Sequence, residues 1–150
     1  MSIVGVWEVR ADGAPFAYHV MTFHPDGTMA QSNPDRGNRV SSDSNGMGNW
    51  RADGATVSGA FLEFTVDRAN PESVYRGIVR FELTVRGDEF SGSASAMFYD
   101  LDGTPRRGPL TAELTGRRFD HLSLPLPAEA GAPAPPKATA ISAISKLGTD

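Results

Sequence analysis

Two side chains with acid–base chemistry lie in stretches that alternate like strands, and their orientation decides what the chain can do. His19 faces inward together with Met21 and Phe23 if its strand is regular. Glu63 lies between two large apolar residues. An inward Glu63 would be a carboxylate in an apolar cavity, where lost hydration raises the pKa and suits the group to general acid–base catalysis.

The opposite orientation of residues 56–67 leaves Glu63 in water. Four apolar side chains then face inward, namely Ala60, Leu62, Phe64 and Val66. The pattern favours this second orientation, because it buries more apolar surface.

Tyr75 falls on the inward face of residues 74–86, where its hydroxyl needs a hydrogen-bond partner or must reach the rim. The candidate catalytic roles are therefore proton transfer by His19 or Glu63 and binding of a carbonyl or enolate oxygen by Tyr75. The candidate ligand-binding residues are further inward side chains, namely Met21, Phe23, Gln31, Trp50, Phe81, Ala94, Ala96 and Phe98.

Composition argues against several other kinds of site. The chain has no cysteine and three histidines without metal-binding spacing, so we expect no metal and no cofactor. The net charge is −4 and the arginines are dispersed, which argues against nucleic-acid binding. No run approaches the ~18 apolar residues of a membrane helix, and no secretion signal is present, so we expect a cytoplasmic protein without a membrane partner.

Asp–Gly and Gly–Asp pairs punctuate the chain and indicate tight hairpins. They separate eight expected strands, at residues 3–10, 16–24, 28–33, 46–51, 56–67, 74–86, 90–99 and 110–119. The fold class is therefore all-β, an eight-stranded antiparallel up-and-down β-barrel. The polar segment 34–45 is long for a connector and is a candidate functional loop or lid.

Small residues on the inward faces, at positions such as Gly77, Gly92, Ala94 and Ala96, leave space inside the barrel. They favour a ligand cavity over the alternative that the glycines only let the strands curve. The barrel domain should cover residues 1–121, followed by a Pro/Ala-rich C-terminal arm at 122–150 that could mediate homo-oligomer formation.

The motif Gly5-Val6-Trp7 on the first strand and the segment Leu114 to Arg118 on the last resemble lipocalins, and in particular short bacterial lipocalin-like proteins of the calycin group. The Thr-Asp-Tyr motif of lipocalins is missing. The resemblance implies that Arg118, or Arg117 in another register, covers the Trp7 ring.

The resemblance also implies a hydrophobic metabolite bound inside the barrel. Because such proteins include cofactor-free enzymes of secondary metabolism, the alternative is a cofactor-independent isomerase, cyclase or dehydratase acting on a polyketide- or terpenoid-like substrate. A third alternative is an interaction module built around the arm.

Overall fold

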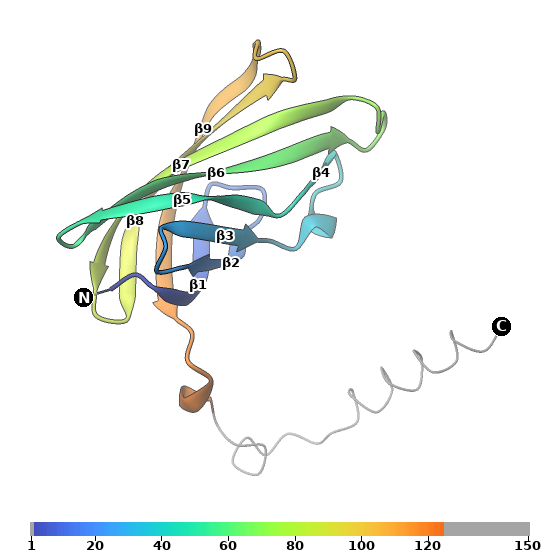
Figure 1. Ribbon diagram of the computed structural model, residues 1–150. Helices are drawn as coiled ribbons and strands as arrows, with labels where there is room; N and C mark the ends of the chain where they lie inside the picture. The colour runs from blue at the N-terminus through green and yellow to red at the C-terminus, as the bar shows by residue number, and fades with distance from the viewer. Residues whose placement is uncertain (1, 125–150) are drawn as a thin grey trace, which may run out of the picture. The chain divides into compact units, whose positions relative to one another are not determined.

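The computed structural model describes residues 2–124, and its strands form one sheet that closes on itself (Figure 1). The strands are β1 (Gly5–Asp12), β2 (Tyr18–Phe23), β3 (Thr28–Ser32), β4 (Ser41–Asp43), β5 (Gly46–Asp53), β6 (Thr56–Asp67), β7 (Val74–Arg86), β8 (Glu89–Asp100) and β9 (Pro105–Arg118). Two 3-10 turns, η1 (Asp35–Gly37) and η2 (His121–Ser123), complete the described elements. The fold is all-β, as predicted.

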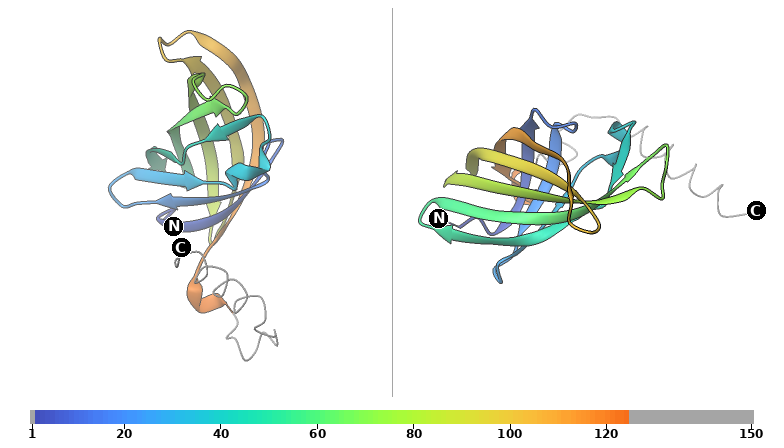
Figure 2. Two further views of the ribbon diagram at one scale, coloured as in Figure 1. Left: turned by 90° about the vertical axis from the view of Figure 1, so that its right-hand side faces the viewer. Right: turned by 90° about the horizontal axis from the view of Figure 1, so that it is seen from above.

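The barrel closes because the first strand, β1, pairs with the last, β9, while the other large strands, β6 and β7 included, pair with the large strands next to them in the chain. All of these pairings are antiparallel, which makes an eight-stranded up-and-down barrel. The short β4 pairs with β6 beyond the end of β5, so β6 has two partners along its length. Figure 2 shows the same ring of strands from two further directions.

The predicted hairpin glycines all have positive φ angles in the structure. These are Gly13, Gly27, Gly54, Gly87 and Gly103, with φ between 60° and 93°. Each lies in a connection between two antiparallel strands, which is where a residue without Cβ is needed. These hairpin glycines therefore mark where successive strands turn back on each other, which determines the order of the strands around the barrel.

The hydrophobic core fills one end of the barrel around Trp7, which is completely buried. Its indole Nε1 donates a hydrogen bond to the Ile3 carbonyl oxygen at 2.7 Å, and its ring lies 5.0 Å from that of Phe90. The Arg118 guanidinium carbon lies 4.4 Å from the centre of the indole ring. The expected contact between Trp7 and Arg118 is therefore present, and it covers this end of the barrel.

The orientation of β6 differs from the favoured expectation. Glu63 is only 7% exposed, whereas Leu62 and Phe64 are 39% and 43% exposed. The two-residue turn at Gly54 pairs Asp53 with Thr56, and unbroken alternation from there points Val57, Phe61 and Glu63 inward. The turn thus fixed which face is buried, although the other face offers more apolar surface.

Two boundaries also differ. Strand β9 begins at Pro105, five residues before the predicted start at 110, and the expected loop 34–45 contains η1 and β4. The compact unit that holds the barrel ends at Phe119, two residues before the predicted boundary at 121. The predicted arm lies outside the described residues from position 125 onward.

No helix within residues 2–124 is long and apolar enough to cross a membrane.

Candidate functional site

A cavity of about 630 Å³ lies inside the barrel, beside the hydrophobic core. Most of its wall is apolar and comes from β1, β2, β6, β7, β8 and β9, with Ala11, Met21, Phe61, Val79, Ala94 and Ala96 among the lining residues. The volume falls in the range of roughly 300–1,000 Å³ that is usual for small-molecule sites. The alanines leave much of this space open, because larger side chains at those positions would occupy it.

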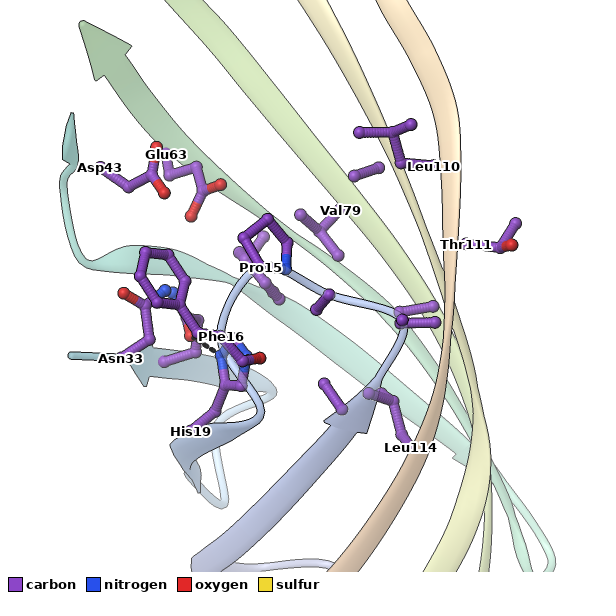
Figure 3. A pocket seen from close by; sticks show the side chains of 18 of the residues that line it. Pro15, Phe16, His19, Asn33, Asp43, Glu63, Val79, Leu110, Thr111 and Leu114 are labelled. Carbon is purple, nitrogen blue, oxygen red and sulfur yellow. Dashed lines mark hydrogen bonds between the residues drawn. The ribbon is translucent and has the colours of Figure 1, made fainter. Parts of the chain in front are cut away.

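The polar end of the cavity, as we call it below, consists of Asn38, Ser41, Asp43, Glu63 and Arg107. Figure 3 shows the Asp43 and Glu63 carboxyl groups close to each other there. Glu63 comes from β6 and Asp43 from the short β4 that pairs with it. A pair of carboxyl groups at one end of an apolar cavity is the most unusual chemical feature of the barrel.

The Glu63 side chain occupies space that a glycine on the next strand leaves free. Gly77 pairs with Glu63 across β6 and β7, and a Cβ atom at position 77 would lie 3.0 Å from Glu63 Cγ and 3.2 Å from the Phe98 ring. No residue between 2 and 124 donates a hydrogen bond to the Glu63 carboxyl, yet its oxygens are not sealed off from the cavity. The carboxyl group is therefore unpartnered and directed into the cavity.

Burial raises the pKa of Glu63 to about 8, and the negative charge of Asp43 adds to the shift. Burial also raises the pKa of Asp43, against the hydrogen bond that Thr65 Oγ1 donates to it at 2.8 Å. Asp35 raises the pKa of Asp43 further, whereas Arg107 and Arg68 lower it. At neutral pH Glu63 is thus a neutral carboxylic acid, and it can donate a hydrogen bond or a proton.

Hydrogen bonds from Arg68 hold in place the segment 35–43, which carries Asp43. The Arg68 Nε and Nη2 atoms donate hydrogen bonds to the carbonyl oxygens of Asn38, Ser41 and Asp35, and Nη2 also pairs with the Asp35 carboxylate at 3.1 Å. Asp35 in turn accepts a hydrogen bond from the backbone N–H of Asp43 at 2.7 Å. The expected functional loop does contribute to the cavity, but it does so as a segment tied to the barrel wall.

His19 lines the cavity with both ring nitrogens already engaged. Its Nε2 donates to the Phe16 carbonyl oxygen at 3.0 Å, and its Nδ1 lies 2.9 Å from Gln31 Oε1. These contacts hold the connection between β1 and β2 against the barrel. The inward orientation of His19 is confirmed, and the geometry gives the imidazole a positioning role.

The other predicted site residues fall into two groups. Met21, Gln31, Ala94, Ala96 and Phe98 line the cavity. Phe23, Trp50 and Phe81 do not line it and pack against one another instead, with the Phe23 ring edge-on to the other two at 6.1 and 6.0 Å.

Tyr75 points inward, as predicted, but it does not line the cavity. The Arg106 guanidinium carbon lies 4.3 Å from the centre of its ring, and the Phe98 ring lies 5.8 Å away. Tyr75 therefore packs with Arg106 and Phe98, and unlike Glu63 it does not line the cavity.

Asp43 and Arg107 are the important residues that the sequence did not point to. Asp43 lies in a polar segment without periodicity, and the segment's unusual length was the only signal. Arg107 precedes the predicted start of its strand, and its guanidinium carbon lies 4.7 Å from the centre of the Phe98 ring. Position alone could not show that either residue reaches the cavity.

Within residues 2–124 no three His, Asp or Glu side chains converge as a metal site would require. Comparison with known proteins gives no match among family models, curated proteins or solved structures. The geometry of the cavity therefore carries the functional argument.

Proposed function

We propose that the barrel binds a small, largely apolar molecule inside its cavity. The observation that carries this proposal is an apolar space of about 630 Å³ next to a core that is otherwise tightly packed. The lipocalin-like sequence features around Trp7 support the same reading. In this proposal the protein is bacterial and cytoplasmic, and its ligand is a hydrophobic metabolite.

Filling the cavity should abolish binding. Ala94→Phe places a ring in the space now left by a methyl group, so we expect the affinity for the apolar dye Nile red to fall at least about tenfold. The matched control is Ser93→Phe, because Ser93 is the exposed neighbour on β8. Dye fluorescence in titrations of both variants measures the effect, with thermal melting to confirm folding. Equal affinity in the native protein and Ala94→Phe would contradict binding in the cavity.

The second candidate function is proton transfer to or from the bound molecule, as in a cofactor-independent isomerase, cyclase or dehydratase. The observation that favours it is the unpartnered Glu63 carboxyl beside Asp43. The raised pKa of Glu63, about 8, suits general acid–base chemistry near neutral pH. Glu63 would transfer the proton. His19, whose two ring nitrogens contact Phe16 and Gln31, would hold this part of the cavity wall in place. Orientation of the substrate by the cavity would supply the rest of the rate enhancement.

Deuterium exchange tests this second candidate. If Glu63 transfers protons, the acetyl methyl group of 2-acetylnaphthalene should exchange faster in D₂O with the native protein than with Glu63→Gln. The reaction breaks a C–H bond, places the proton on the Glu63 carboxylate and returns a deuteron to the enolate carbon. NMR integration of the methyl signal measures it at pH 9, where Glu63 is ionised. Equal exchange rates in the native protein and Glu63→Gln would contradict proton transfer by Glu63. Ligand binding would then be the only proposed function that remains.

A further inference from the structure

The polar end of the cavity has a chemistry that selects among apolar ligands. We propose that the ligand carries a neutral carbonyl group, which accepts a hydrogen bond from the Glu63 carboxylic acid at the polar end of the cavity. This inference rests on the proposed binding function and names the class of molecule that the same cavity takes.

The first support is the unpartnered state of Glu63. Its side chain is more than nine-tenths buried, and no described residue forms a hydrogen bond with it. Buried polar groups are normally hydrogen-bonded, and an unsatisfied one destabilises the protein. Gly77, the residue paired with Glu63 on β7, has no side chain that could provide the bond. The partner must therefore come from inside the cavity.

The second support is the charge around Glu63 from each neighbouring element. Asp43 on β4 is the nearest carboxyl, and Thr65 on β6 already donates to it. Asp35 and Arg68 are paired with each other. Arg107 on β9 interacts favourably with Asp43.

These groups argue against a charged ligand. A ligand carboxylate would bring a further negative charge to a site that already holds two carboxyl groups. A ligand ammonium would find the charge of Asp43 already balanced in part by Arg107 and Arg68. A neutral hydrogen-bond acceptor fits the protonated Glu63 without either cost, so a ketone, aldehyde, ester or amide carbonyl is favoured.

The test uses four ligands with one apolar body: 2-acetylnaphthalene, 2-ethylnaphthalene, 2-naphthoate and 2-naphthylmethylamine. Calorimetric titrations at pH 6 compare the native protein with Glu63→Leu, which lacks the donor, and Glu63→Gln, which keeps a neutral donor. We expect the native protein to prefer the ketone over the hydrocarbon by about fivefold, the preference to vanish in Glu63→Leu, and Glu63→Gln to retain most of it.

The same comparison at pH 9.5 gives an independent check. Ionised Glu63 cannot donate, so the ketone preference should disappear in the native protein and persist in Glu63→Gln. The hydrocarbon is the internal control, because its binding needs only the apolar wall. If the hydrocarbon binds without any ketone preference, this inference is wrong and the binding function stands. Tighter binding of the amine or the carboxylate also overturns it, and no binding of any ligand overturns both proposals.

Discussion

Replacing Glu63 with glutamine should remove most of the loss of stability that we expect of the native barrel between about pH 5 and pH 8. The pKa of this carboxyl is raised from 4.5 to about 8 in the folded chain. In that window the folded protein keeps a proton that the unfolded chain has lost, so the free energy of unfolding falls as pH rises. Below the window both states are protonated and the effect vanishes. Above it the penalty is complete, on the order of 5 kcal/mol.

Chemical denaturation at a series of pH values measures this difference. Near pH 4 the native protein and Glu63→Gln should have similar stability, and at pH 9 the variant should be the more stable. Asp43, whose pKa is also raised, leaves a smaller slope of the same sign in both proteins. The lowered pKa values of Asp26, Asp35 and Asp102 act only in more acidic solution.

Glu82→Gln is the matched control for this experiment, because Glu82 is an exposed carboxylate on β7. It should leave the pH profile unchanged. Parallel profiles for the native protein and Glu63→Gln would mean that Glu63 is not held protonated in the cavity. The hydrogen-bond donor on which the carbonyl inference depends would then be absent at neutral pH.

Replacing Gly92 with alanine should destabilise the barrel by roughly 2–4 kcal/mol. A Cβ atom at this position would overlap the Glu82 carbonyl oxygen and would lie 2.8 Å from the Cα atom of Leu83, its partner on β7. Both contacts are with backbone, so neither can be relieved by a side-chain rotation. The two strands would have to move apart at this pair of residues.

Denaturant unfolding of Gly92→Ala, with Ser93→Ala as the control on the exposed face, measures this cost. Because the strain lies in the sheet, ligand binding should fall only as far as folding is lost. A loss below about 0.5 kcal/mol would show that the strands accommodate a methyl group there, and that Gly92 is not needed for curvature.

The order of the strands could be predicted from the sequence because local chemistry determines it. A residue with a positive φ angle is required in each tight connection, and glycine beside aspartate marks those places. Residues 74–86 alternate almost without interruption, and β7 has the bounds and the inward face that this alternation indicates. The Trp7 contact with Arg118 could also be anticipated, since it joins the first and last strands of a closed barrel.

The shape of the cavity was harder to predict. It depends on how side chains from strands far apart in the sequence pack together inside the barrel. Gly92 and Gly48 are glycine because neighbouring backbone lies where a Cβ would be, and Gly116 because the Phe90 ring packs over it. At Gly59 both the Asn49 carbonyl oxygen and the Phe81 ring occupy that space. These four do not line the cavity, so they fit the curvature alternative. The alanines at 94 and 96 are the small residues that leave the space open.

Glu63 shows the limit of hydrophobic patterning most clearly. Counting apolar residues assigns the wrong face of β6, because the rule assumes that the buried face is the more apolar one. The hairpin turn fixes the alternation instead, and Gly77 provides room for the carboxyl. A single buried acid in an otherwise apolar stretch is the kind of local conflict that functional sites tolerate.

The central claim is that an apolar molecule occupies the inside of the barrel, and methyl NMR tests it most directly. Methionine methyl groups labelled with ¹³C report on both faces of the sheet, since Met21 lines the cavity and Met47 is exposed on the outside. With bound 2-acetylnaphthalene we predict intermolecular NOEs to the Met21 methyl and none to the Met47 methyl. NOEs to Met47 without any to Met21 would place the ligand on the outer face of the sheet and contradict the proposed function.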